Sequence, residues 1–172
     1  MKADIGERMQ TPLWAPWRME YIRAVKPSDC FICQIIKETS DAENLILLRG
    51  EYTLLLMNRY PYNSGHLLVA PYRHIATFQE LTLDEQQEIS SFTQIALHAL
   101  QSLMNPDGFN MGINQGAAAG AGLEGHLHQH IIPRWNGDTN FMPVVGQTRV
   151  IPQLLEEQYQ QLKAAIDQRA KN

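Results

Sequence analysis

Apolar residues recur at helical spacing in one long segment, which is the clearest element of the chain. From Thr82, apolar side chains follow every three or four residues as far as Leu103, and Asn105-Pro106 then interrupts the pattern. Acidic residues occupy the first turn after Thr82, as is typical of a helix N-terminus. The pattern predicts one long helix over this segment.

Two shorter helices are predicted near the ends of the chain. Cys30 to Lys37 reads as a short helix after the capping residues Ser28-Asp29, and a second helix runs from about Pro152 to Ala170 with proline in its first turn. Residues 1–28 combine prolines with aromatic residues and predict an arm that lies across a surface.

Short apolar runs bounded by glycine, proline or polar turns predict strands. These runs are Leu45–Leu48, Tyr52–Met57, His66–Ala70, Phe109–Asn114 and His126–Ile132. Gly50 makes the first two a hairpin, Pro71 ends the third and Pro133 ends the last, while residues 116–125 form a Gly/Ala-rich connection. Short strands around a long helix, without regular alternation, predict an α+β fold with a largely antiparallel sheet of about five strands.

Composition narrows the class of protein. A chain of 172 residues with 44% hydrophobic residues fits one compact domain. Its net charge of -4 gives no long-range attraction to polyanions, which argues against a nucleic-acid partner. No apolar run reaches the roughly 20 residues of a membrane span, and the first residues lack the apolar core of a secretory signal. We therefore expect a cytoplasmic protein without a membrane partner.

Three histidines alternate along the last predicted strand. On an extended strand, His126, His128 and His130 project from one face. Such a row can bind a transition metal, or it can supply a nucleophile with neighbours that orient it. The spacing does not separate these two hypotheses.

Residues 125–134, GHLHQHIIPR, resemble the signature of the histidine-triad family. Residues 58–69, NRYPYNSGHLLV, are similar to the first conserved block of that family, and Asn114-Gln115-Gly116 is similar to its second. The resemblance covers roughly residues 28–135. It implies a domain core over 29–135, preceded by the arm and followed by an extension, 136–172, whose helix packs on the same domain.

The resemblance implies a role for each matching residue. His128 is the expected nucleophile, which forms an adenylyl-histidine intermediate, and His130 and His66 lie near the phosphate. Gln115 is expected to contact the α-phosphate and Asn58 the ribose. The full set of expected nucleotide-binding residues is Asn58, Leu68, Asn114, Gln115, Gly122 and Trp135.

Two positions depart from the family pattern. Gln129 stands where an apolar residue is usual, and Gly122-Leu123 stands where members often have a hydroxyl that contacts phosphate. Trp135 and Phe141 are candidates for covering a purine by stacking, and are equally interpreted as core or interface aromatics. The small residues from Gly116 to Gly122 would let backbone amides approach an anion.

Segments outside the main blocks point to a subgroup. Residues 13–18, LWAPWR, and 133–143, PRWNGDTNFMP, look like a bacterial subgroup that includes diadenosine tetraphosphate phosphorylases. This resemblance implies an enzyme that cleaves dinucleoside polyphosphates, by phosphorolysis in preference to hydrolysis, without an organic cofactor and as a homodimer. The alternatives are a mononucleoside phosphoramidate hydrolase, a metal-dependent hydrolase with three triad ligands, and a non-catalytic nucleotide-binding or redox module containing zinc.

The only two cysteines, Cys30 and Cys33, have a spacing that serves a redox pair, two metal ligands or a local disulfide. In zinc-bearing members of the family, two histidines complete the site, and the matching residues here are His74 and His126. The resemblance thus implies a structural zinc, against the alternative of buried thiols that pack as apolar groups. His98, in the long predicted helix, receives no function.

Overall fold

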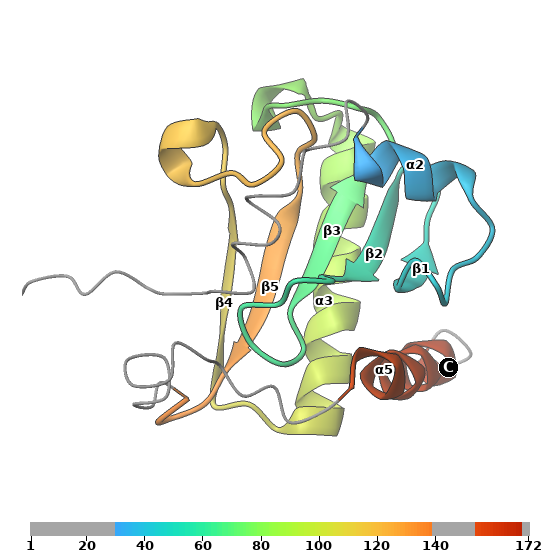
Figure 1. Cartoon of the computed structure of the whole chain (residues 1–172), viewed down its shortest axis with the longest axis vertical. Helices are drawn as coiled ribbons and strands as arrows, with labels where there is room; N and C mark the ends of the chain where they lie inside the picture. Colours follow the sequence, from blue (N-terminus) through green and yellow to red (C-terminus); the bar gives the residue numbers. More distant parts are fainter. Residues whose placement is uncertain (1–29, 139–153, 170–172) are drawn as a thin grey trace, which may run out of the picture.

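The computed structural model describes residues 30–138 and 154–169, and the predicted N-terminal arm lies outside them. Five antiparallel strands form one sheet in the order β1-β2-β3-β5-β4, and helices pack around it (Figure 1). The strands are β1 (Ile46–Arg49), β2 (Thr53–Met57), β3 (Leu67–Pro71), β4 (Gly108–Ile113) and β5 (Gln129–Arg134). The predicted α+β class is confirmed.

The helices are α2 (Phe31–Lys37), α3 (Leu83–Met104) and α5 (Leu155–Arg169), with short 3-10 turns η1 (Phe78–Glu80) and η2 (Ala117–Ala119). Thr82 caps α3 and forms a capping box with Glu85, as the pattern predicts. Cys30 is the N-cap of α2, whereas the predicted cap, Ser28-Asp29, lies outside the described residues. Pro152 and Ala170, the predicted ends of the last helix, lie outside them too.

The two faces of the central strands belong to different hydrophobic clusters. Leu55 and Val69 join α3 and α5 in one cluster, whereas Leu54 and Leu68, their neighbours in the chain, pack with α2 on the other face. Because both faces are covered, β2 and β3 are buried along their whole length. This explains why these strands read as continuous apolar runs.

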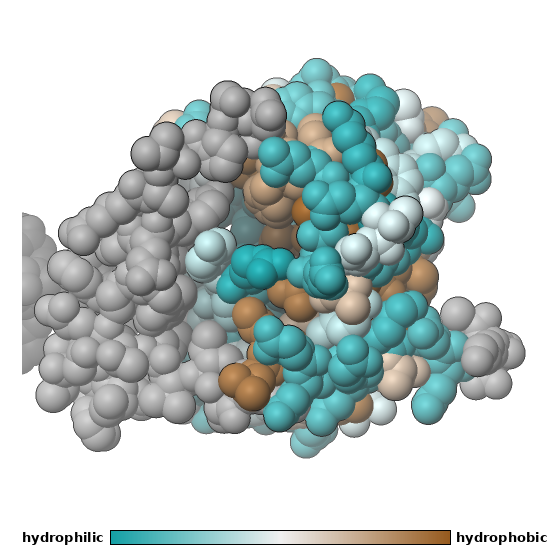
Figure 2. Space-filling view, turned by 45° about the vertical axis from the view of Figure 1, so that its right-hand side comes forward, coloured by the Kyte–Doolittle hydropathy of each residue, from teal (hydrophilic) through white to brown (hydrophobic). Residues whose placement is uncertain are grey.

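One side of the molecule shows how polar and apolar residues are distributed on the surface. Figure 2 shows hydrophilic residues over most of the described surface on this side, with smaller hydrophobic areas between them. None of the described helices combines the length and the hydropathy needed to cross a bilayer.

Several predicted strand ends are wrong, and the last strand shows why. The predicted strand ran from His126 to Ile132 and was ended by Pro133, but β5 begins at Gln129 and continues through Pro133 to Arg134. Pairing with β3 stops at Ile131, while β4 still pairs beyond it. The Pro133 carbonyl accepts a hydrogen bond from Asn63 on the β3 side, so the missing N–H costs no bond to β4.

The third strand does end at Pro71, but it includes this proline as its last residue, opposite Thr53, instead of ending at Ala70. The remaining differences are shifts of one residue at the ends of β1, β2, β3 and β4. Such ends depend on ladder bonds with distant strands, which local patterns do not report.

Candidate active site and metal centre

The segment before β5 is pinned to the turn that follows β3. Leu127 donates its backbone N–H to the Ile75 carbonyl at 2.7 Å, and the His126 ring donates from Nε2 to the Pro71 carbonyl at 2.8 Å. His126 is fully buried. Its position is therefore determined by the turn from Pro71 to Ile75.

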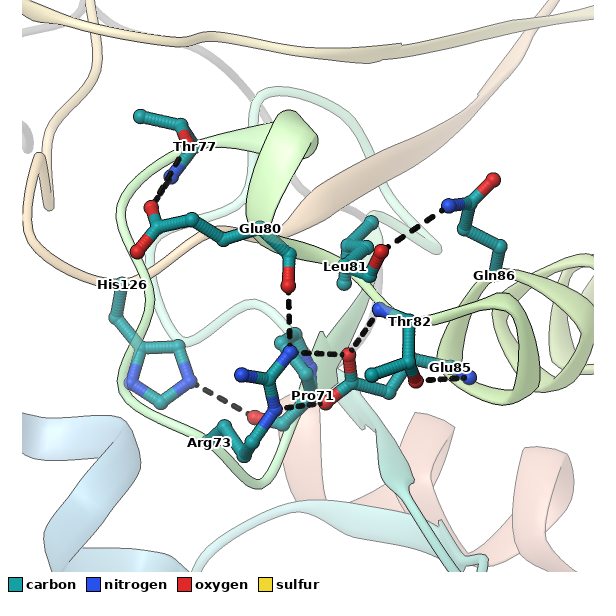
Figure 3. A network of polar contacts seen from close by, with 9 residues as sticks. All are labelled: Pro71, Arg73, Thr77, Glu80, Leu81, Thr82, Glu85, Gln86 and His126. Atoms are coloured by element: carbon teal, nitrogen blue, oxygen red, sulfur yellow. Dashed lines mark hydrogen bonds and ion pairs between the residues drawn. The ribbon is translucent and has the colours of Figure 1, made fainter.

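The turn from Pro71 to Ile75 is itself anchored to the start of α3 (Figure 3). The guanidinium of Arg73 donates to both carboxylate oxygens of Glu85 at 2.7 Å, and to the Glu80 carbonyl at 2.6 Å. The Glu85 side chain is only 3% exposed. The Arg73 guanidinium holds the pKa of this carboxyl below its usual range, so the pair is ionised at neutral pH.

Four side chains from separate parts of the chain meet beside this turn. Cys30, Cys33, His74 and His126 place one ligand atom each within 4.8 Å of one another. Cys33 Sγ lies 3.2 Å from His74 Nδ1 and 3.5 Å from His126 Nδ1, and Cys30 Sγ lies 3.3 Å from His126 Nδ1. Gly125 permits this approach, because a Cβ there would come within 3.3 Å of His74 Nε2.

These distances fit a tetrahedral zinc site. Zinc bound to sulfur at about 2.3 Å and to nitrogen at about 2.0–2.1 Å separates two such ligand atoms by about 3.6 Å. Because His126 Nε2 donates to Pro71, its Nδ1 carries the lone pair that a metal requires. Burial lowers the pKa of His126 to about 4, which keeps the ring neutral. Burial and the neighbouring Cys30 raise the pKa of Cys33, so a thiolate there needs a cation.

A second imidazole pair lies on the same side of the sheet. His66 Nε2 lies 2.9 Å from His130 Nδ1, and the Tyr62 backbone N–H donates to His66 Nδ1 at 3.1 Å. Since Nδ1 of His66 accepts, its Nε2 carries the proton and donates to His130. His130 Nδ1 therefore accepts, and the proton of its neutral ring is on Nε2.

His128 is held in the complementary tautomer. Its Nδ1 donates to the His126 carbonyl at 2.8 Å, which leaves the lone pair on Nε2. Its ring meets that of His130 edge to face, with centroids 4.9 Å apart. Burial lowers the pKa of His128, so the ring is neutral at physiological pH. The pair thus offers one nucleophilic nitrogen and, from His130, one N–H donor.

Comparison with known proteins agrees with this arrangement. The family model described as "HIT domain" matches residues 39–137. The chain belongs to the HIT family. An AP-4-A phosphorylase of Mycobacterium tuberculosis is 40% identical over 164 residues, which cover 89% of this chain and 83% of the relative. This similarity agrees with the predicted phosphorylase subgroup.

Solved structures of HIT proteins share the fold. A zinc-bound histidine triad protein from Mycobacterium smegmatis has a TM-score of 0.67 and 28% identity, and covers 83% of this chain and 96% of its own. A diadenosine triphosphate hydrolase of Plasmodium falciparum has a TM-score of 0.58 at 18% identity, and covers 76% of this chain and 79% of its own. The second likeness concerns the fold alone.

The three triad histidines of this HIT protein do not converge on one point. His126 directs Nδ1 to the cysteines and Nε2 to Pro71, whereas His128 is held by the His126 carbonyl. His130 pairs with His66 instead. The arrangement therefore divides the triad between two clusters, and does not provide three ligands for one catalytic metal.

Some of the expected nucleotide-binding residues lie close to the histidines. The Asn58 amide nitrogen lies 3.3 Å from His66 Nδ1, and its carbonyl oxygen accepts from Tyr60 N–H. Leu68 is buried and lies opposite His130 in the ladder between β3 and β5. Asn114 and Gly122, both half-buried, flank the loop that carries η2.

Other residues that were expected to bind the nucleotide have different contacts in the structure. Gln115 accepts from the Phe78 N–H at 2.9 Å and donates to Gln79, so in this structure it binds η1. Trp135 follows the far end of β5, where its indole N–H donates to the Met104 carbonyl at the end of α3. Phe141 lies outside the described residues.

The departure at Gln129 has a local explanation. Gln129 lies on the face of β5 that packs on α3, and its amide donates to Thr93 Oγ1 at 2.8 Å. A polar residue is thus satisfied where the family usually has an apolar one.

Two contributors to the site carry no signal in the sequence. The Tyr62 ring stacks on the His66 ring with centroids 4.8 Å apart. Arg73 anchors the turn that holds His126.

Proposed function

We propose that this HIT protein is a dinucleoside polyphosphate phosphorylase in which His128 is the nucleophile. Its strongest support is the pair of complementary tautomers, with a lone pair on His128 Nε2 beside the ring of His130, whose N–H is on Nε2. The 40% identity to an AP-4-A phosphorylase supports the substrate class. A neutral imidazole can approach a phosphate without charge repulsion.

The reaction has two steps. His128 Nε2 forms a bond to the α-phosphorus of diadenosine tetraphosphate, the bond from this phosphorus to its bridging oxygen breaks, and ATP leaves. Inorganic phosphate then attacks the adenylyl group, the bond to nitrogen breaks, and ADP leaves. His130 stabilises the developing charge by donating from Nε2 to a phosphoryl oxygen, and the His66 ring keeps His130 in that tautomer.

Product analysis tests this proposal. Purified protein is incubated with diadenosine tetraphosphate, with and without inorganic phosphate. ADP and ATP in equal amounts, formed only with phosphate, are the expected products. AMP and ATP without phosphate would indicate a hydrolase, and turnover of adenosine phosphoramidate alone would favour the phosphoramidate hydrolase.

The nucleophile is tested by His128→Ala. This variant should lose turnover while keeping nucleotide binding within about tenfold, because only the bond-forming atom is removed. His98→Ala is the matched control, since His98 is exposed on α3 and lies outside both imidazole clusters. Near-normal turnover by the His128 variant would refute the mechanism.

We also propose that Cys30, Cys33, His74 and His126 hold one structural zinc. Four protein ligands would leave no open position for a water, so the ion would stabilise the fold and supply no chemistry. Metal analysis of the purified protein should find about one equivalent of zinc per chain. Less than about a tenth of an equivalent, with stability unchanged by chelation, would rule out the proposal.

We propose a homodimer as the working state. Among the described residues, β4 pairs only with β5 and exposes Met111, which is 53% accessible. An open strand edge of this kind favours association with a second sheet. Light scattering of the full chain should give about twice the monomer mass, and a monomer at micromolar concentration would contradict this.

A further inference from the structure

A buried glutamine sits in the apolar face of α5. Tyr159, Leu162 and Ile166 pack from this helix into the main core, and Gln158 beside them is only 4% exposed. The match to the HIT domain ends at residue 137, so α5 lies beyond it. Burying an amide is unfavourable unless both of its polar groups are bonded, and a leucine would pack there without that requirement.

Both polar groups of Gln158 bind the turn that leads to His66. Its Oε1 accepts the Gly65 N–H at 3.0 Å, and its Nε2 donates to Ser64 Oγ at 3.2 Å. Gly65 adopts φ +77, and a Cβ there would lie 2.9 Å from Leu100 and from Met104 of α3. The turn is therefore held between α3 and α5, and the Gly65 N–H depends on Gln158 for an acceptor.

His66 comes next in the chain, and its ring sets the state of His130. The Tyr62 N–H donates to His66 Nδ1, and His66 Nε2 lies 2.9 Å from His130 Nδ1. A rotation of the peptide at Gly65 would move the His66 ring away from one or both partners. Without the His66 N–H, His130 could place its own proton on Nδ1 and lose the donor on Nε2.

We propose that Gln158 is a positioning residue of the active site: α5 fixes the Ser64–Gly65 turn and thereby the orientation and tautomer of His66 and His130. This inference rests on the proposed function only for its effect on turnover. The coupling between Gln158 and the two rings stands on the hydrogen bonds alone.

Three variants of the full chain test the proposal. Gln158→Leu removes both hydrogen bonds, whereas Gln158→Glu keeps an acceptor for the Gly65 N–H. Tyr159→Phe is the matched control, because the neighbouring Tyr159 hydroxyl is also buried but donates to the Ile46 carbonyl in β1, away from the histidines. Each variant is measured for kcat and KM with diadenosine tetraphosphate, for Tm, and for the ring ¹⁵N signals of labelled histidines.

Gln158→Leu should lower kcat by about tenfold or more with a smaller change in KM. The reason is that the variant misplaces the N–H donor of His130, whereas the groups that bind the nucleotide stay in place. The ring signals of His66 and His130 should move, and those of His98 should not. Gln158→Glu should recover most of kcat, and Tyr159→Phe should lower Tm without moving these signals. If the leucine variant does not fold, Gln158→Glu and Ser64→Ala supply the comparison, with the alanine variant shifting the same signals.

Two results would overturn the proposal. One is a folded leucine variant whose kcat stays within about twofold of wild type and whose His66 and His130 signals do not move. The other is an equal loss of kcat in Tyr159→Phe, which would show that any weakening of α5 has the same effect. If the wild-type protein does not turn over the tetraphosphate, the proposed function fails, and the ring signals still decide the role of Gln158.

Discussion

Replacing Arg73 should destabilise the protein through the carboxylate that it leaves behind. Arg73→Met removes two hydrogen bonds of 2.7 Å to Glu85, and one of 2.6 Å to the Glu80 carbonyl. The Glu85 side chain is 3% exposed, so water cannot readily replace the guanidinium. The Glu85 carboxylate then keeps the hydrogen bond from the Thr82 backbone N–H at 2.8 Å, which is one half of the capping box.

The expected loss follows from the burial of the two partners. Removing one member of a buried ion pair costs about 3–5 kcal/mol. The Arg73 side chain is 49% exposed, so part of its contribution is already screened by solvent. We therefore expect Arg73→Met to lower the free energy of unfolding by about 2 kcal/mol. Arg73→Lys keeps the charge but loses the paired hydrogen bonds to the two carboxylate oxygens, and should lower it by about 1 kcal/mol.

Urea unfolding at pH 7 measures this difference, with Lys163→Met as the control. Lys163 pairs with Asp167 on α5, and both side chains are at least 34% exposed, so its loss should cost less than about 0.5 kcal/mol. The pH dependence gives a second readout. The pKa of Glu85 is lowered from 4.5, so its stabilisation is present above that pH and is lost as the pH falls through the lowered value. In the methionine variant this dependence should shrink. Equal losses in Arg73→Met and Lys163→Met would refute the reasoning.

Three further predictions concern the site and its support. The lowered pKa of His128 keeps this proposed nucleophile neutral, so single-turnover release of ATP, plotted against pH, should lose rate only below pH 6.5; a midpoint above that pH would contradict the burial of the ring. Thr93→Val removes the acceptor of the Gln129 amide and should cost about 1 kcal/mol in urea unfolding, and no loss would mean that this bond contributes nothing. Chelation of the purified protein should lower Tm, and Cys33→Ser should abolish this response; a Tm unaffected by chelation in wild type would contradict a structural metal.

Local patterns predict the elements of this fold better than their limits. The helix from Thr82 was predictable because its cap and its apolar stripe lie within one segment. The end of β5 was not, because Pro133 is tolerated only where β3 has stopped pairing and Asn63 bonds its carbonyl. That circumstance involves a residue 70 positions earlier in the chain.

The candidate site was likewise predictable from the sequence only in part. Alternation suggested that three histidines share one face, and only the resemblance to a family separated His126 from the other two. The family resemblance did not single out Gln158 or Arg73. Gln158 bonds Gly65 across 93 positions, and nothing in the residues around either one identifies the other.

The two rings proposed to meet the phosphate are set from different helices. Arg73 ties the turn after β3 to the start of α3, and this turn holds His126, whose carbonyl orients His128. Gln158 reaches from α5 to the turn before His66, whose ring orients His130. His126 itself contacts both clusters, because its ring faces the cysteines while its carbonyl accepts a hydrogen bond from the His128 ring. A change at the proposed zinc site should therefore shift His128 through the His126 carbonyl, whereas a change in α5 should affect His130 first.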